Sequence, residues 1–277
     1  MMIDVLLATY NGAEYLRQQI DSIINQSFQS FRLIIHDDGS NDETRNIIRS
    51  YTQKMPDKVF FLDDDFFPGG AKKNFSYLLN KSSSSYIMFS DQDDIWLPEK
   101  LEKMYNKILE LEKSNPELPI LVHSDLSLID ETGTIFEDSF FFHLKLKKKI
   151  ERLEDILVEN SVSGCAMIFN RKAVNLSSPI PNEAMMHDWW ISCQVMKNRG
   201  IIYFIDEPLV YYRQHSRNVI GAKKAGYLFY IKKLSNPLKT ADYLKRLYIQ
   251  IKCLKKEYTI SQYIFDLSKT IIRKLKS

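Results

Sequence analysis

The sequence predicts an α/β fold around a parallel, doubly wound central sheet. Short apolar runs typical of buried strands alternate with segments whose apolar residues recur at helical spacing. Three of the first four apolar runs end in clustered aspartates, and sheets of this kind bind ligands outside the carboxyl ends of their strands. The chain of 277 residues is 44% hydrophobic and 26% charged, which supplies a sizeable core and suits an ordinary folded protein.

The first part of the chain contributes four strands and one helix to this fold. A helix is predicted over residues 13–26, because Leu16, Ile20 and Ile23 recur at helical spacing. Each strand is an apolar run that ends in a turn signal or in aspartates, and the four are expected at residues 3–8, 31–35, 59–62 and 86–89. The aspartates after these strands should therefore gather along one edge of the sheet.

The second part of the chain predicts a more varied set of elements. A helix should follow Pro98, which is a favourable first-turn residue. A hairpin is predicted over residues 126–136, turning at Glu-Thr-Gly. Residues 140–152 are aromatic and then basic, and their pattern predicts no element. Further elements are expected at residues 120–123 (strand), 162–169 (strand), 188–198 (helix), 201–212 (one or two short strands) and from residue 226 onward (mostly helix).

Residues 91–94, Asp-Gln-Asp-Asp, form the most informative segment. Asp91 and Asp93 lie two residues apart at the end of a predicted strand, so both carboxylates can turn toward one hard cation. Carboxylate and water ligands suit magnesium or manganese, Mg²⁺ or Mn²⁺. The segment could instead be an acidic loop that caps the following helix, because Asp favours helix starts. Its place after an apolar run and before Ile-Trp-Leu-Pro favours the metal site.

Other acidic motifs fit this segment less well. A calcium-binding EF-hand needs a central glycine that is absent here. A phosphatase with the pattern D-x-D-x-T would resemble the segment, but Ile95 stands where Thr or Val would be expected. A phosphatase also leaves the acidic ends of the other strands unexplained.

Residues 37–40, Asp-Asp-Gly-Ser, follow the second predicted strand. A carboxylate at this position could accept hydrogen bonds from a nucleobase N–H or a ribose hydroxyl, while Gly39 permits a tight turn. Asp, Gly and Ser are also common in turns of no special function. Taken alone, the segment favours a plain turn.

In this order the motifs resemble the family 2 glycosyltransferases, which have the A-type nucleotide-binding fold. The resemblance covers roughly residues 1–220, and the combination of motifs is far more specific than any one of them. It implies a Rossmann-like, mostly parallel central sheet, and the helical pattern after Gly226 adds a helical appendage at the C-terminus. The motifs that carry it are residues 8–12 (Ala-Thr-Tyr-Asn-Gly), 26–28 (Gln-Ser-Phe), 37–40 (Asp-Asp-Gly-Ser) and 90–96 (Ser-Asp-Gln-Asp-Asp-Ile-Trp).

The resemblance implies roles for residues of the donor side. In the family, the loop after the first strand and the second Asp of Asp-Asp-Gly-Ser hold the nucleotide, which implies roles for Ala8, Tyr10 and Asp38. Asp91 would face the ribose or the metal, and Asp93 would be a direct metal ligand. Two further residues resemble the donor-contacting segment of the family, namely Lys73 and Asn74. A metal at this place would bridge the two phosphates of a nucleotide-sugar and neutralise the departing diphosphate.

Inverting transfer is a single displacement at the anomeric carbon and needs a base for the acceptor hydroxyl. The family carries Glu-Asp where this chain has His187 and Asp188, and the resemblance implies that Asp188 is the base. His187 replaces the usual Glu and could orient the acceptor or Asp188 itself. Asp188 could also simply cap the helix that it opens. Trp189 and Trp190 could stack on sugar rings or lie in the core.

Two further segments are expected near the acceptor and the diphosphate. Gly164 and Cys165 resemble the small-residue loop of the family near the acceptor, where Gly lets backbone approach a ligand. Arg213 or Arg217 could bind the diphosphate by forked hydrogen bonds. His215 could be a further metal ligand, although a lone His is more often structural or solvated.

The combination of Ala-Thr-Tyr-Asn-Gly, Asp-Gln-Asp-Asp-Ile-Trp and His-Asp-Trp-Trp resembles the bacterial rhamnosyltransferase-like branch of the family. This resemblance implies a dTDP-rhamnose donor and a product of polysaccharide or O-antigen type. The acceptor would be a glycan or a lipid-linked oligosaccharide. Donor sugars change readily on a constant fold, so this inference rests on analogy within the family.

Charge is distributed unevenly along the chain. Residues 223–277 hold fourteen Lys and Arg against three Asp and Glu, and the rest of the chain is net acidic. After Gly226, apolar residues at helical spacing alternate with lysines. A basic amphipathic helix can lie on the inner leaflet of a membrane, where each Lys or Arg contributes about 1 kcal/mol. The same pattern also fits a helical cap with a solvated basic face. The acidic body and the absence of a recognisable nucleic-acid module argue against nucleic-acid binding.

The N-terminal residues lack the basic and small-residue features of a secretory signal, and no apolar run of eighteen residues occurs in the sequence. A cytoplasmic location is therefore expected, with peripheral attachment to the cytoplasmic face of the membrane if the tail binds lipid. The motif order predicts three regions, which are residues 1–97 (nucleotide-sugar-binding half), 98–222 (acceptor-binding half of the same catalytic domain) and 223–277 (basic helical region).

Two other functions are compatible with the same motifs. One is a catalytically silent module that binds a sugar nucleotide or a glycan on the same fold. The other is a metal-dependent phosphohydrolase, which would release inorganic phosphate instead of a nucleoside diphosphate. Measuring the product distinguishes all three functions.

Overall fold

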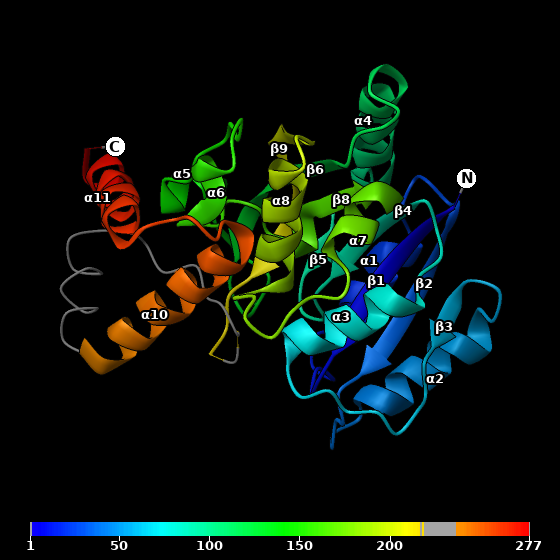
Figure 1. The fold of residues 1–277 in the computed structure, drawn as a ribbon. Coiled ribbons are helices and arrows are strands. Elements are labelled where there is room, and N and C mark those ends of the chain that lie inside the picture. The colour runs from blue at the N-terminus through cyan, green and yellow to red at the C-terminus, as the bar shows by residue number, and fades with distance from the viewer. Residues whose placement is uncertain (1, 217, 219–236, 277) are drawn as a thin grey trace.

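The structure is a computed structural model, and it describes residues 2–216, 218 and 237–276. The strands in these residues are β1 (Ile3–Thr9), β2 (Phe31–Asp37), β3 (Val59–Phe61), β4 (Tyr86–Ser90), β5 (Ile95–Trp96), β6 (Ile120–Ile129), β7 (Ile135–Glu137), β8 (Met167–Asn170) and β9 (Ile201–Arg213). Over the described residues they form one nine-stranded sheet in the order β3-β2-β1-β4-β8-β6-β9-β5, with β7 paired to β6. Helices cover both faces of the sheet (Figure 1), so the predicted α/β class is confirmed.

The first half of the sheet is parallel, as the sequence predicts. β1 pairs in parallel with β2 and with β4, and β2 pairs in parallel with β3. The chain leaves β1 toward β2 on one side and returns from β3 to β4 on the other side of β1. The carboxyl ends of β1 and β4 therefore flank a point where the strand order reverses, which is where open α/β sheets bind their ligands.

The second half of the sheet is mixed. β8 runs antiparallel to both β4 and β6, while β9 runs parallel to β6 and antiparallel to β5. The predicted hairpin forms from the end of β6 and β7, and β6 is longer than the predicted strand. The strand predicted at residues 162–169 begins only at Met167, because the small residues Gly164–Ala166 form a 3₁₀ turn.

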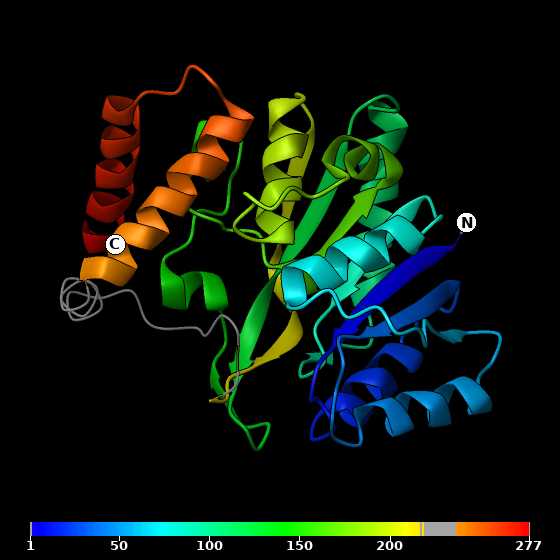
Figure 2. The same ribbon diagram turned by 60° about the horizontal axis from the view of Figure 1, so that its bottom comes forward.

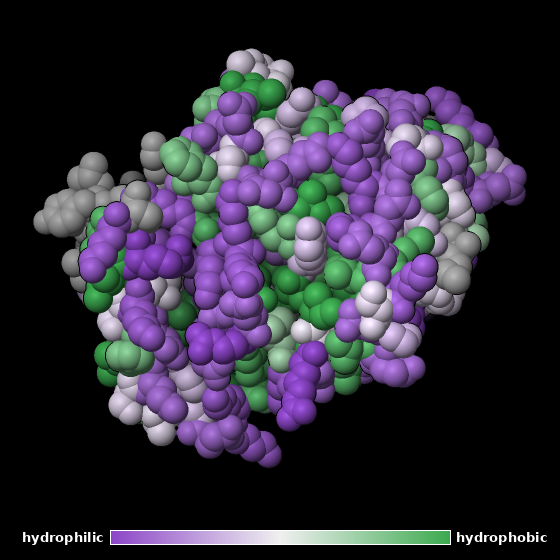
Figure 3. Space-filling model, turned by 90° about the horizontal axis from the view of Figure 1, so that it is seen from above, coloured by the Kyte–Doolittle hydropathy of each residue, from purple (hydrophilic) through white to green (hydrophobic). Residues whose placement is uncertain are grey.

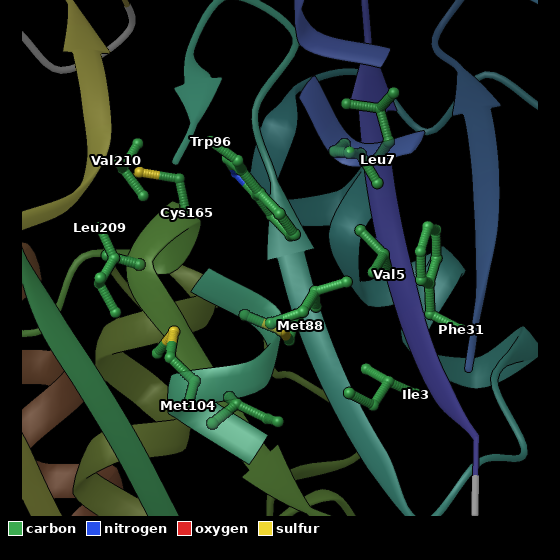
Figure 4. Packing of buried hydrophobic residues seen from close by; sticks show 14 of the residues in the cluster. Ile3, Val5, Leu7, Phe31, Met88, Trp96, Met104, Cys165, Leu209 and Val210 are labelled. Atoms are coloured by element: carbon green, nitrogen blue, oxygen red, sulfur yellow. The ribbon is translucent and has the colours of Figure 1, made fainter. Parts of the chain in front are cut away.

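Two apolar clusters hold the helices against the sheet. Along β1, Ile3, Val5 and Leu7 point to one face, while Leu6 points to the other, as the alternation of a strand requires. The first cluster packs under α1 (Leu16–Ile24), α2 (Thr44–Lys54), α4 (Lys100–Ser114) and α5 (Phe140–Leu144), and part of it is drawn in Figure 4. The second packs under α3 (Ala71–Lys81), α6 (Glu154–Leu157), α7 (Arg171–Ser177) and α8 (His187–Lys197).

The C-terminal region is helical where the structure describes it. Its two helices are α10 (Pro237–Leu254) and α11 (Ile260–Lys276), and they stand together at one end of the molecule (Figure 2). α10 buries Leu247, Ile251 and Leu254 in the second cluster, whereas α11 buries only Tyr263. None of the helices in the described part of the chain has both the length and the apolar composition needed to cross a membrane.

Candidate active site

One large cavity, of about 1530 Å³, extends from the carboxyl ends of β1 and β4 to the C-terminal helices. It brings together most of the residues that the sequence singles out. Those in its wall are Ala8, Tyr10, Asp38, Asn74, Asp91, Asp93, Gly164, Cys165, His187, Asp188, Trp189 and His215. Lys73, Trp190 and Arg213 are described by the structure but lie outside the wall, and Arg217 lies outside the described residues.

The loop after β1 is fixed to the loop after β4 by a side-chain amide. Tyr10 N donates to Gln92 Oε1 over 2.8 Å, and Gln92 Nε2 donates to Tyr10 O over 3.0 Å. A Cβ atom on Gly12 would lie 2.2 Å from the same Oε1, so only glycine leaves room for this amide. The Tyr10 side chain is 56% exposed in the cavity wall and is available to stack on a planar ring. Sequence reasoning assigned no role to Gln92.

The two aspartates after β2 differ in what they contact. Asp37 is buried and accepts hydrogen bonds from Thr9 Oγ1 and Ser40 N, both over 2.8 Å, so it joins the ends of β1 and β2. Asp38 faces the cavity, and its carboxylate accepts from the backbone N–H groups of Gly69 and Gly70 just before α3. The first aspartate therefore builds the turn, and the second lies where a ligand can reach it.

The two residues predicted on α3 have different positions. Asn74 lines the cavity and is buried, with its Oδ1 lying 2.6 Å from His36 Nδ1 and its Nδ2 donating to His36 O over 3.2 Å. Its amide thereby holds α3 against β2. Lys73 is exposed and is not in the cavity wall, so the expectation that it contacts the donor is not supported.

Asp91 and Asp93 form an acidic group on the wall beside β4. Burial and, after it, the negative charges of Asp93 and Asp188 raise the pKa of Asp91 to about 7. Asp93 Oδ2 lies 2.8 Å from Nε2 of His215, which comes from the segment after β9. Carboxylates crowded together in this way favour a bound cation, because a cation offsets their repulsion.

Asp91, Asp93 and His215 all face the cavity, and their oxygen and imidazole groups are of the kind that a divalent metal prefers. The group in the described residues whose ligand atoms lie within 4.8 Å of one another is a different one, formed by Asp91, Asp94 and Cys165. Burial raises the pKa of the Cys165 thiol well above its usual range, however, which disfavours the thiolate that binds metals. Asp94 is fully buried, outside the cavity wall. Oxygen and imidazole ligands suit manganese or magnesium better than a thiol does.

A buried lysine lies behind this acidic group. The Lys100 ammonium is 3.3 Å from the centroid of the Trp96 ring and donates to Cys165 O. Its positive charge lowers the pKa of Asp91, while burial lowers the pKa of Lys100 itself to about 7. Lys100 is thus an internal counter-charge for the aspartates. Its burial cannot be predicted from the sequence, because a Lys in a first helical turn normally lies in solvent.

Asp188 lies on the cavity wall in the first turn of α8. Its Oδ2 accepts from Gly164 N over 3.1 Å and from Asn160 Nδ2 over 3.3 Å, and its Oδ1 accepts from Trp189 N over 2.7 Å. Burial raises its pKa to about 6 despite these hydrogen bonds, which favour the charged form. The carboxylate is therefore held in one orientation and titrates close to neutral pH, as a general base should.

His187 is also buried in the cavity wall. Its ring stacks on Phe75, with 4.2 Å between ring centroids, and meets the ring of Phe89 edge-on at 4.8 Å. Burial lowers its pKa to about 3, so the imidazole is neutral. Neither ring nitrogen has a hydrogen-bond partner among the described residues. A buried polar atom of this kind is costly unless a ligand satisfies it.

The two tryptophans after Asp188 point to different places. Trp189 lines the cavity, and its Nε1 donates to Ile156 O over 2.6 Å. Trp190 is buried outside the cavity wall, with Nε1 donating to Ser177 O over 3.0 Å. The expectation of a role for Trp190 on the acceptor side is therefore not supported, because its ring packs into the core.

Arg213 has a structural position that its sequence context did not reveal. The side chain is 2% exposed, and its guanidinium donates to the backbone carbonyls of Asp93, Asp130 and Glu131 and to Gln18 Oε1. These bonds join the loop after β4, the β6–β7 turn and α1. The expectation that Arg213 binds the diphosphate is not supported, because its hydrogen-bonding groups are engaged within the protein.

Residues 4–176 match the family model described as Glycosyl transferase family 2. The chain is also similar to the dTDP-rhamnosyl transferase RfbG of Shigella flexneri. The two are 27% identical over 227 residues, which cover 78% of this chain and 74% of that protein.

Solved structures with the same fold bind nucleotide sugars. Residues 1–349 of TarS from S. aureus, in complex with UDP-GlcNAc, give a TM-score of 0.64 at 18% identity and cover 99% of this chain and 72% of that chain. The mannosyltransferase PcManGT from Pyrobaculum calidifontis, in complex with GDP-Man and Mn²⁺, gives a TM-score of 0.58 at 12% identity and covers 98% of this chain and 79% of that chain. At these identities the likeness shows the A-type fold alone.

Proposed function

This chain belongs to glycosyltransferase family 2, and from this premise we propose that it transfers a hexose from a nucleoside diphosphate to an acceptor hydroxyl, with inversion at the anomeric carbon. The observation that carries this proposal is the position of Asp188. Its carboxylate is fixed by three hydrogen-bond donors and lies on the same cavity wall as the acidic group beside β4. A base and a charged donor site in one cavity are what a single displacement requires.

Asp188 is proposed to accept the proton of the acceptor hydroxyl as that oxygen attacks the anomeric carbon. Gly164 N and Asn160 Nδ2 hold the accepting oxygen in place, and Trp189 N holds the other oxygen. His187 is proposed to bind a substrate hydroxyl with a ring nitrogen that lacks a protein partner. Gly164, Cys165 and Trp189 would line the acceptor side of the cavity.

The donor is proposed to bind between the carboxyl ends of β1 and β4. Ala8, Tyr10 and Asp38 would contact the nucleoside, and Asn74 would border the same region. Asp91, Asp93 and His215 would hold a divalent metal, Mn²⁺ or Mg²⁺, which when bound would neutralise the charge of the diphosphate.

The identity of the donor sugar is proposed from similarity. The likeness to the Shigella flexneri dTDP-rhamnosyl transferase supports dTDP-rhamnose as the donor. A bacterial surface polysaccharide is proposed as the product from the resemblance of the sequence motifs to the rhamnosyltransferase-like branch. In this proposal residues 1–97 bind the nucleotide-sugar, residues 98–222 bind the acceptor, and residues 223–277 are a helical appendage.

The proposed function is tested by thermal unfolding with a panel of nucleoside diphosphates, with and without manganese. A ligand at one hundred times its dissociation constant stabilises a protein by about 2.7 kcal/mol, so the midpoint should rise visibly with the matching nucleotide. Product analysis with the corresponding nucleotide sugar should then find the nucleoside diphosphate. The absence of any shift across the panel, or the release of inorganic phosphate, would contradict the proposal.

We further propose that the protein attaches peripherally to the inner leaflet through α11. Its outward residues Ile264, Phe265 and Ile272 are 50–61% exposed and lie beside basic residues of the same helix. Figure 3 shows hydrophobic and hydrophilic side chains interspersed at the end of the molecule where α11 lies. A helix of this composition suits the membrane interface.

We expect the full chain to float with vesicles that contain anionic lipid, and a Phe265→Ser, Ile272→Ser double variant to float several-fold less. Phe136→Ser is the control, because Phe136 is about equally exposed but lies on β7. Equal flotation of the wild type and the double variant would exclude α11 as the attachment site, and the helices would then serve as a cap.

A further inference from the structure

The cavity continues past Asp188 into a part with a different chemistry. Beyond the acidic group and Asp188, the wall becomes mainly apolar and is contributed by the segments after α5 and α6, the loop before α8, and the helices α10 and α11. We call this part the apolar arm and define it by Leu146, Val158, Met185, Leu244, Leu267 and Ile271. Sugars and nucleotides are rich in hydrogen-bonding groups, and an apolar wall leaves such groups unsatisfied.

We propose that the apolar arm binds the alkyl or isoprenoid chain of a lipid-linked acceptor whose sugar hydroxyl lies at Asp188. This inference rests on the proposed function and selects one of the two acceptor classes, glycan or lipid-linked oligosaccharide, that the sequence resemblance implies. The arm and Asp188 belong to the same cavity, so a molecule that fills the arm can also reach the base. The donor region at β1 and β4 lies at the other end of this cavity, which leaves the arm to the acceptor.

The charged groups near the arm are already engaged within the protein. Glu159 lines the cavity and forms ion pairs with Arg273 and Lys274 of α11. Lys145 donates to Lys274 O, and Arg273 donates to Lys145 O. These contacts fix α11 at the edge of the cavity, where the single negative charge of Glu159 offsets part of the positive charge of Arg273 and Lys274. Thr240, Tyr243 and Thr270 also line the cavity, so this part of its wall is mainly rather than wholly apolar.

The path of the alkyl or isoprenoid chain can be followed along α11. Ile260, Ile264, Leu267, Ile271 and Leu275 are spaced by three or four residues and so share one face of the helix. Leu267, Ile271 and Leu275 line the cavity, whereas Ile260 and Ile264 do not line it and are each 61% exposed. The apolar stripe thus runs from the cavity wall to the outer surface. A chain longer than the arm can leave the protein along this stripe.

The probe for this inference is a series of alkyl glucosides with methyl, butyl, hexyl and octyl chains, used below micelle-forming concentrations and followed by calorimetry. Every member of the series carries the same glucose, so differences in affinity within the series report on the alkyl chain alone. The unknown identity of the acceptor sugar therefore does not affect the test. Burial of one CH₂ contributes about 0.8 kcal/mol, which is about a fourfold gain in affinity. We expect the wild type to bind up to about fourfold more tightly for each added CH₂.

The test variant is Ile271→Gln combined with Leu275→Gln, which makes the cavity side of α11 polar. Both positions are partly exposed, at 38% and 54%, so the fold should tolerate them. We expect the gain in affinity per CH₂ to fall at least by half. The control is Ile249→Gln on α10, which is likewise 38% exposed but lies outside the cavity wall and should keep the gain of the wild type.

The outcomes separate this inference from the proposed function. The wild type could bind a nucleoside diphosphate while its affinity for the glucosides does not depend on the length of the alkyl chain. In that case only the inference of a lipid-linked acceptor is overturned. If Ile249→Gln reduces the gain as strongly as the cavity variant, the alkyl chain binds outside the arm and the inference is also overturned. If no nucleoside diphosphate binds, the proposed function itself fails, whatever the glucosides do.

Discussion

Asp188→Asn is expected to lower kcat for sugar transfer by about two to four orders of magnitude, which is the usual cost of removing a general base. The amide keeps the size of the side chain and can still accept hydrogen bonds through its oxygen, but it cannot take up the acceptor proton. Binding of the nucleoside diphosphate should be unchanged, because Asp188 lies outside the proposed donor contacts. The measurements are steady-state transfer and thermal shift on the same preparation.

Glu159→Gln is the matched control for this experiment. Glu159 is a second carboxylate in the wall of the same cavity, but it pairs with Arg273 and Lys274. Its substitution should cost less than tenfold in kcat. If Asp188→Asn transferred sugar at the wild-type rate, another group would have to act as the base.

The pH dependence of transfer gives a second signature of Asp188. Burial raises the pKa of this carboxyl to about 6, and the base acts only when ionised. The rate of the wild type should therefore fall about tenfold per pH unit below about pH 6 and level off above it. A bound divalent cation would favour the ionised form of Asp188 and move this fall in rate to lower pH. The residual activity of Asp188→Asn should not show the fall in rate.

Asp93→Ala is expected to abolish the manganese-dependent part of the thermal shift with the nucleoside diphosphate. In the proposal, Asp93 is a direct ligand that lies next to His215, and a divalent metal loses affinity steeply when a charged ligand is removed. Transfer activity should fall with metal binding. Both are measured by titrating manganese at a fixed concentration of nucleotide.

Asp65→Ala is the control for the metal experiment. Asp65 belongs to the aspartate cluster after β3, but it is exposed and lies outside the cavity wall. It should leave the manganese titration unchanged. A full manganese-dependent shift in Asp93→Ala would place the metal elsewhere, and the buried group of Asp91, Asp94 and Cys165 would then be the next position to substitute.

Local patterns are sufficient to predict the four strands and the first helix of the first half of the fold, whereas α2 and α3 are not among the predicted elements. Each strand from β1 to β4 is an apolar run with its own turn signal, and all are parallel. Their common direction is why aspartates far apart in the sequence could be placed at one edge. In the second half, the antiparallel direction of β8 depends on its neighbours β4 and β6 and leaves no mark in its own residues. The sequence therefore predicted the strand but not its direction.

Which candidate residues reach the cavity depends on contacts that residue type does not reveal. Arg213, Lys73 and Trp190 are candidates by residue type, and the structure places them outside the cavity wall. Lys100 and Gln92 carry no comparable signal in the sequence. A buried lysine or a bridging amide is defined by its partners, and the hydrogen-bond partners of these two residues are 65 residues or more away in the chain.

The position of Arg213 bears on how this enzyme could be recombined with its relatives. A crossover near residue 97 would seem natural for exchanging donor specificity between two family members. Arg213 would then come from one parent, while Gln18 and the Asp93 carbonyl that it binds would come from the other. A working chimera would have to inherit this arginine together with the loop and helix that it holds. The unit of exchange in this fold is therefore a set of contacts rather than a stretch of sequence.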